Sequence, residues 1–183
     1  MSSMSGTPIV PAYTVTARVL HWITAILVLT MVPVGITIAN EWGGAAQPLL
    51  YTLHKSVGAL LIPLVLFRIF YRLTHPPAPL PGDIPAIQRF AAEAVHWSLY
   101  ALILIQPLIG WVATASFPAP LPFFGLFELP AIVGPDRPLS DRLFAVHRAL
   151  GLLIGALAAM HIGAALFHHF VRKDRVLMRM LTG

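Results

Sequence analysis

Four long apolar stretches restrict the fold of this chain more than any other feature of its sequence. A helix that crosses a bilayer needs about 20 mainly apolar residues. Stretches of this kind predict helices over about residues 13–40, 50–73, 88–116 and 141–171. Only 10% of the residues are charged, whereas soluble domains carry about 25%. We therefore expect an all-α fold, an integral membrane four-helix bundle that residues 1–183 form as a single transmembrane domain.

The basic residues predict the orientation of the bundle. Loops on the cytoplasmic side of membrane proteins carry an excess of Lys and Arg. If the N-terminus is cytoplasmic, eight basic residues lie inside, namely Arg18, Arg68, Arg72, Arg89, Arg172, Lys173, Arg175 and Arg179. The four outside are Lys55, Arg137, Arg142 and Arg148. We therefore expect both termini in the cytoplasm, and the net charge of +5 then reflects topology and not a nucleic-acid partner.

The chain has no cysteine, and this limits the cofactors it can hold. Disulfides, thiolate-bound iron–sulfur clusters and covalently attached c-type haem are excluded, because all of them need thiols. The connection over residues 117–139 is unusually apolar, with Phe123, Phe124, Leu126 and Phe127. We expect this connection to lie on the membrane surface as a lid.

Histidines inside the predicted spans indicate a function. Five of the eight histidines are there: His21, His54, His96, His147 and His161. A polar side chain in hydrocarbon is unfavourable, so an intramembrane histidine indicates a functional site by default. The alternative is that each imidazole only forms a hydrogen bond between helices.

The spacing of the histidines favours two iron sites. His147 and His161 are fourteen residues apart, which places both rings on one helix face, about 21 Å apart along the axis. His54 starts the second helix and lies level with His147 near the outer face, whereas His21 lies level with His161 near the inner face. Two level pairs predict two bis-histidine sites. Zinc or di-iron is disfavoured, because the apolar stretches lack the carboxylates or thiolates that such sites need.

Glycines near the histidines agree with this prediction. Gly58 and Gly151 lie four residues after the first histidines of the second and fourth helices, on the same face, where a macrocycle needs space. Gly35 lies fourteen residues after His21 and so faces the outer site. A compatible alternative is that these small residues only let the helices pack closely.

Several motifs connect the chain to a known family. They are R-V-L-H-W in the first helix, L-H-K-S-V-G in the second, H-W-S-L-Y and P-L-I-G in the third, and H-R-A-L-G, M-H-I-G-A-A-L-F-H-H-F and K-D-R-V-L-M-R-M in the fourth helix and tail. Over nearly its whole length the chain resembles the prokaryotic cytochrome b561 family of four-helix, di-haem membrane proteins. The resemblance implies two haem b cofactors, one bound by His21 with His161 and the other by His54 with His147. It also implies a multi-pass protein in the lipid of the bacterial inner membrane.

Other polar residues at the inner side have expected roles in quinone binding. His168 lies seven residues after the second histidine of the fourth helix, on the same face and about 10 Å closer to the cytoplasm. We expect it to hydrogen-bond a quinone, with His169, Arg172 and Arg18 beside it. The alternative is that the two histidines only mark the membrane interface. His96 occupies in the third helix the position that His21 occupies in the first. We expect it to hydrogen-bond a haem propionate or a quinone, and iron binding is the alternative.

Cationic residues have expected roles at the haem edges. Arg18, Lys55 and Arg148 are expected to bind haem propionates. Arg137 and Arg142 are expected to steer a small anion towards the outer site, because surplus positive charge speeds such encounters.

The resemblance implies an oxidoreductase that oxidises superoxide, or takes electrons from another periplasmic donor, and reduces ubiquinone. An alternative from a different class is a haem b membrane-anchor subunit that passes electrons between a partner dehydrogenase or hydrogenase and the quinone pool. The apolar loop from Phe117 to Pro130 would then be its docking surface. A haem-free channel or proton carrier is a third reading, and it predicts no b-type absorption band.

Overall fold

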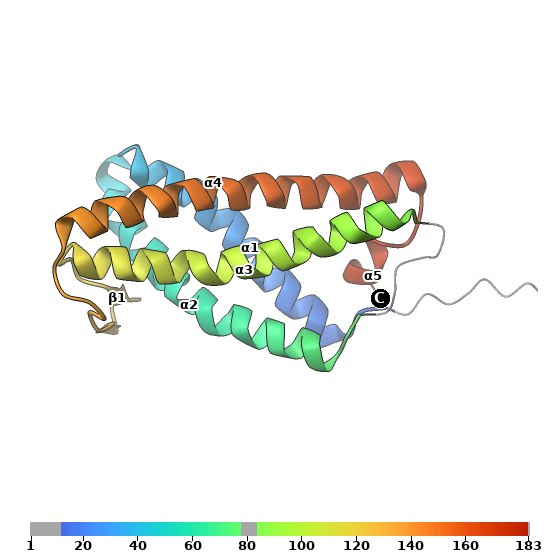
Figure 1. Ribbon diagram of the computed structural model, residues 1–183, viewed down its shortest axis with the longest axis horizontal. Helices are drawn as coiled ribbons and strands as arrows, with labels where there is room; N and C mark the ends of the chain where they lie inside the picture. The colour runs from blue at the N-terminus through green and yellow to red at the C-terminus, as the bar shows by residue number, and fades with distance from the viewer. Residues whose placement is uncertain (1–11, 78–83, 183) are drawn as a thin grey trace, which may run out of the picture.

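The structure is a computed structural model that describes residues 12–77 and 84–182. Four long helices run along the molecule (Figure 1), and they are α1 (Val15–Ala39), α2 (Gln47–Thr74), α3 (Ala86–Ser116) and α4 (Arg137–Phe167). All four are long and apolar enough to cross a membrane. The predicted four-helix membrane bundle is therefore confirmed.

Three of the four helices, α2, α3 and α4, begin a few residues earlier than the apolar pattern predicts. α4 begins at Arg137 rather than at 141, since the Asp136 carboxylate accepts a hydrogen bond from the Leu139 N–H at 2.9 Å and a proline occupies the first turn. α2 begins at Gln47, directly after the short 3-10 turn η1 (Gly44–Ala46), and it too has a proline in its first turn.

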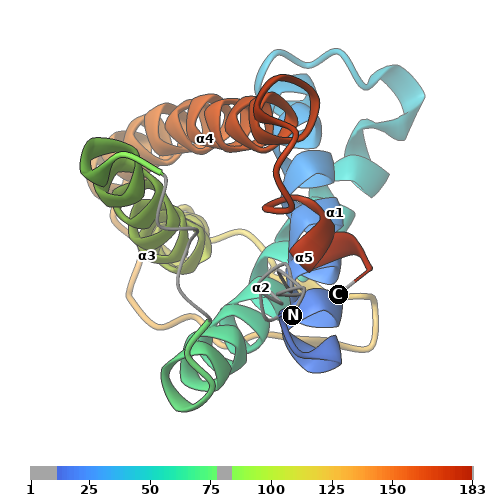
Figure 2. The same ribbon diagram turned by 90° about the vertical axis from the view of Figure 1, so that its right-hand side faces the viewer.

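The helices form a ring in which each packs against the next and α4 closes against α1, as the end-on view shows (Figure 2). A small core of six buried residues lies half-way along the bundle: Val28, Leu61, Val65, Tyr100, Ile103 and Ile154. Large apolar side chains cover the outside, where Ile26 and Phe70 are each 62% exposed. An apolar exterior of this kind suits contact with lipid.

The connection between α3 and α4 contains a short hairpin at one end of the bundle, which we call the hairpin end (Figure 1). Its strands are β1 (Pro122–Phe123) and β2 (Phe127–Glu128), paired antiparallel. Ser56 on α2 anchors it, since its hydroxyl donates to the Pro122 carbonyl and accepts from the Phe124 N–H, both at 2.9 Å. The expected lid is thus a hairpin fixed to the start of α2.

The opposite end, which we call the α5 end, holds the start of α1 and the last described residues. After the π-helical turn η2 (His168–Arg172), the chain reverses and α5 (Met178–Leu181) packs on α1. Trp22 Nε1 donates to the Met180 carbonyl at 3.1 Å, and the Tyr13 N–H donates to the Arg179 carbonyl at 3.4 Å. An even number of spans brings both described chain ends to one end of the bundle.

Candidate functional site

The first histidine pair lies towards the hairpin end. His54 from α2 faces His147 from α4, with ring centroids 6.0 Å apart and ring planes at 76°. Gln106 on α3 fixes His147 twice: its backbone carbonyl lies 3.1 Å from His147 Nδ1, and its side-chain amide donates to the His147 carbonyl at 2.6 Å. A proton on Nδ1 that binds a carbonyl leaves the lone pair on Nε2, which is the nitrogen that a metal needs.

The second histidine pair lies towards the α5 end. His21 from α1 faces His161 from α4, with ring centroids 6.2 Å apart and ring planes at 63°. His96 from α3 lies closer still, with its centroid 5.1 Å from that of His161. Arg68 from α2 donates to His21 Nδ1 at 2.7 Å. All four helices therefore contribute a polar side chain to this end of the bundle interior.

Two glycines let the hairpin-end rings pack closely against neighbouring helices. A Cβ at Gly35 would lie 3.2 Å from His54 Cε1, and a Cβ at Gly110 would lie 3.0 Å from His147 Cε1. Both distances are shorter than the 3.5–4.0 Å or so of an ordinary carbon contact. Gly35 therefore faces the outer site as expected, whereas the role of Gly110 was not apparent from the sequence. A Cβ at Gly58 would make only an ordinary contact, 3.9 Å from Pro107.

Three cations are expected to bind haem propionates. In this structure each of them donates a hydrogen bond to an oxygen atom of the protein. Arg18 donates to the Leu181 carbonyl at 3.3 Å, Lys55 to the Pro120 carbonyl at 3.0 Å and Arg148 to the Asn40 side chain at 3.3 Å. Arg18 lies at the α5 end, whereas the other two lie at the hairpin end. Their propionate roles stay predictions.

His168, the expected quinone ligand, is held by a carboxylate that the sequence analysis missed. Its Nδ1 is hydrogen-bonded to Asp174, which Arg172 also contacts at 3.3 Å. Burial would raise the pKa of Asp174, but hydrogen bonds from His168, from the Val176 N–H and from Arg172 outweigh it and hold the pKa below its ordinary value. The anionic carboxylate therefore orients the ring, and the tail motif K-D was the available signal.

The cations expected to steer an anion are partly neutralised. Arg137 pairs with Asp141 at 3.0 Å, and its guanidinium lies 4.5 Å from the centroid of the Phe117 ring. Arg142 has no ion pair with any described residue. Four acidic residues balance the four basic ones at the hairpin end, namely Glu41, Glu128, Asp136 and Asp141. The surplus of positive charge that the sequence analysis assumed is therefore not present at this end.

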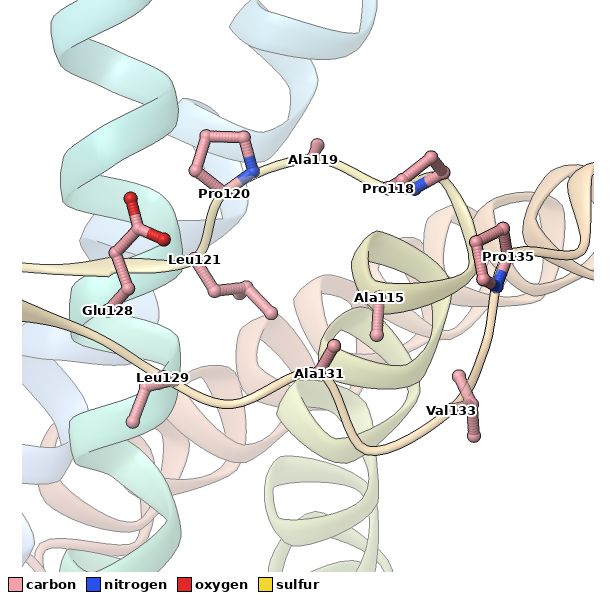
Figure 3. Close-up of a pocket in the computed structure, with 10 residues that line it drawn as sticks. All are labelled: Ala115, Pro118, Ala119, Pro120, Leu121, Glu128, Leu129, Ala131, Val133 and Pro135. Carbon is pink, nitrogen blue, oxygen red and sulfur yellow. The ribbon is translucent and has the colours of Figure 1, made fainter.

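A cavity of about 390 Å³ lies beneath the connection between α3 and α4 (Figure 3). Its walls are mainly alanine, proline and leucine side chains, and Glu128 is the only charged residue among those that line it. It contains none of the histidines and none of the cations discussed above. The histidine pairs, and not this cavity, therefore form the candidate site.

Comparison with known proteins assigns the family. The family described as prokaryotic cytochrome b561 matches residues 12–183. The chain belongs to the prokaryotic cytochrome b561 family. It is 34% identical to cytochrome b561 homolog 2 of Escherichia coli, over 98% of this chain and 95% of that protein. It is 30% identical to the probable superoxide oxidase CybB of Yersinia pestis over 88% and 91%, and 30% identical to cytochrome b562 of Cereibacter sphaeroides over 93% and 96%.

Membership of the cytochrome b561 family gives the chain a general function. It is a multi-pass protein of the bacterial inner membrane that carries electrons with haem b. Among the described residues, no group of three or more His, Asp or Glu side chains is arranged to hold a bare metal ion. Histidines in pairs suit an iron whose other ligands come from a porphyrin.

The geometry of the pairs fits a haem iron. Two metal–imidazole bonds of about 2.0–2.1 Å on opposite sides of one iron, with about 1.1 Å from each nitrogen to its ring centroid, put the centroids about 6.3 Å apart. The pairs His54–His147 at 6.0 Å and His21–His161 at 6.2 Å agree with this separation. The 5.1 Å between His96 and His161 is too short. His54 Nδ1 is buried without a hydrogen-bond partner among the described residues, so no carbonyl fixes the tautomer of His54 as the Gln106 carbonyl does for His147.

Proposed function

We propose that this chain binds two b haems and carries electrons from the hairpin end, on the periplasmic side, to a membrane quinone at the α5 end, on the cytoplasmic side. His54 and His147 hold the outer haem, and His21 and His161 hold the inner one. The observation that carries the proposal is the pair of iron-compatible ring separations, 6.0 and 6.2 Å. Fourteen residues of α4 separate the pairs, which is about 21 Å along its axis.

The chain supplies the positions and the surroundings for this transfer. When bound, haem supplies one-electron redox chemistry at each histidine pair. Gln106 fixes the tautomer of His147, and Gly35 and Gly110 give the hairpin-end rings their space. The buried core, with Ile154 midway between the two histidines of α4, keeps water out between the two sites.

A quinone at the α5 end needs protons as well as electrons, since a quinone becomes a quinol by gaining two of each. His168 is suited to deliver a proton, because Asp174 orients the ring through Nδ1 and the second ring nitrogen can carry a proton to a bound quinone. An apolar groove of about 410 Å³ on α1 contains Arg18, Trp22 and Leu181. The groove gives a lipid-soluble ring access to this end, with the Arg18 guanidinium as a donor to a carbonyl oxygen.

Superoxide is the donor we propose at the hairpin end. The Yersinia pestis relative is named a probable superoxide oxidase. Each superoxide that gives up one electron becomes O₂, so two are consumed for every quinone reduced. Because Arg137 is paired with Asp141, we propose that Arg142, with Lys55 and Arg148 at the same end of the bundle, provides most of the local attraction for the anion.

Purified protein supplied with a soluble quinone tests this function. It should contain close to two haems per chain by pyridine haemochrome and should consume superoxide. His54→Ala and His147→Ala should each remove the outer haem alone. A wild-type ratio near one haem per chain would contradict the two-haem proposal.

The second candidate is the membrane-anchor subunit of a larger enzyme. The hairpin favours it, because Leu126 is 78% exposed and Phe127 is 55% exposed at its tip, and exposed apolar patches often bind partners. This candidate would be the better one if superoxide failed to reduce the haems and a larger polypeptide copurified with the chain.

A further inference from the structure

Arg68 is a cation inside the membrane-spanning part of α2 and has no acidic partner among the described residues. Its guanidinium donates to His21 Nδ1 at 2.7 Å and lies 4.9 Å from the centroid of the Tyr100 ring. No described carboxylate forms an ion pair with it. Arg72 lies one turn further along α2 and adds a second positive charge, 5.8 Å from the same ring. A charged side chain within the bilayer is normally paired, so this position calls for an anion.

The present partner of Arg68 is incompatible with iron binding by His21. A guanidinium has only donors, so His21 Nδ1 must accept the hydrogen bond, and the proton of the neutral ring is then on Nε2. Iron needs the lone pair of Nε2, which requires the proton on Nδ1. The ring cannot satisfy both at once. If His21 is an axial ligand, as the proposed function requires, Arg68 must leave it when haem binds.

The carboxylates of haem are the anionic groups available to receive this guanidinium. We propose that Arg68 exchanges His21 Nδ1 for a propionate of the inner haem and anchors that haem in the bundle. The planar fork of Arg matches a carboxylate with two hydrogen bonds. Tyr100, which is only 8% exposed, provides a fixed surface for the guanidinium on α3. Arg18, for which a propionate role is also expected, lines the groove on α1, so the two cations would act at different places of the α5 end.

Three variants of the haem-loaded protein test the proposal. Arg68→Gln removes the charge, Arg68→Lys keeps the charge but loses the fork, and Arg89→Gln is a control. Arg89 lies at the start of α3 and donates to the Ile84 carbonyl at 2.9 Å, away from the histidines. The measurements are haem content per chain, the propionate bending band in resonance Raman spectra, and a redox titration.

A cation bound to a propionate stabilises the reduced iron, which carries less positive charge. Arg68→Gln should therefore change the oxidised-to-reduced ratio of the inner haem at the wild-type midpoint by tenfold or more, a downward shift of about 59 mV for one electron. Both Arg68 variants should shift the propionate band, since neither can bind a carboxylate with a fork. Arg68→Lys should keep most of the wild-type potential, and Arg89→Gln should keep both properties.

The outcomes separate this inference from the function on which it rests. If His161→Ala leaves the haem content unchanged, His161 is not a ligand of the inner haem, and the proposed inner site fails together with the Arg68 proposal. If the inner haem exists but both Arg68 variants keep the wild-type band and potential, only the Arg68 proposal fails. Selective loss of the inner haem in Arg68→Gln, with both haems kept in Arg68→Lys, would support it. If Arg68→Gln does not fold, the band of Arg68→Lys decides.

Discussion

Gly110 provides a direct test of whether the hairpin-end pair holds a haem. In Gly110→Ala the new Cβ would lie 3.0 Å from His147 Cε1 and 3.3 Å from His147 Nδ1. Ordinary carbon contacts are about 3.5–4.0 Å, so the overlap is about half an ångström or more. The ring cannot move away freely, because Nδ1 is bound to the Gln106 carbonyl at 3.1 Å and Nε2 would be bound to iron.

The expected loss follows from the cost of overpacking. Inserting a methyl into a well-packed site typically costs about 1–3 kcal/mol, which corresponds to about a 5- to 150-fold weaker haem affinity. Gly35→Ala should lose less, since its Cβ would lie 3.2 Å from His54 Cε1. Gly163→Ala in α4 is the matched control, because nothing lies within 4 Å of its Cβ position. Alanine is the better helix former by about 0.5–1 kcal/mol, so this control should be neutral or stabilised.

The assay is haem content per chain, combined with the rate of haem transfer to an excess of an acceptor apoprotein. Gly110→Ala should lose the outer haem faster than the wild type and should keep the inner one. Equal rates of haem loss in Gly110→Ala and Gly163→Ala would refute the reasoning, because the steric contact would then not limit the position of an iron ligand.

Three further variants test single residues. His96→Ala should keep both haems, because the ring separation of 5.1 Å from His161 is too short for a shared iron; loss of a haem, measured by pyridine haemochrome, would make His96 a ligand. Arg142→Glu should slow reduction by superoxide more than Arg137→Glu, whose charge Asp141 already offsets, and raised salt should reduce the difference. Asp174→Asn should slow reoxidation by quinone with haem content unchanged. In the wild type, Asp174 stabilises the folded tail above its ordinary pKa, and this stabilisation is lost as the pH falls through its lowered folded pKa. Limited proteolysis of the tail at several pH values would detect the loss.

The sequence was sufficient for the features that depend on one helix at a time. Long apolar stretches with few charges predict the four spans, and a rise of about 1.5 Å per residue predicts the depth of each histidine. The pair of Arg137 with Asp141 was also readable, since residues four apart on a helix are neighbours, yet the sequence analysis missed it. The start of α4 could also have been read from the sequence, because Asp136 comes before a proline in the first turn.

Apart from the level histidine pairs, contacts between helices could not be predicted in this way, because they depend on how one helix is rotated against another. Arg68 was counted only as a basic residue of the inner side, although it reaches His21 across the α1–α2 boundary. Gln106 was not considered, although it holds His147 from α3. A polar or charged residue within a span was the available signal in both cases, since such residues usually face the bundle interior.

The two histidine pairs differ in how far they are prepared for iron, and this predicts the order in which they fill. His147 has its Nδ1 bound to the Gln106 carbonyl, so its Nε2 lone pair is already available. His21 is bound by Arg68, and this hydrogen bond must break before the ring can bind iron. Preorganised sites bind more tightly because they spend less free energy on rearrangement. When haem is titrated into the apoprotein in detergent, the first equivalent should therefore fill the hairpin-end site, and its spectrum should be absent from His54→Ala. A first equivalent that His54→Ala still binds with wild-type affinity would show that the α5 end fills first, and that the hydrogen bond from Arg68 does not oppose haem binding.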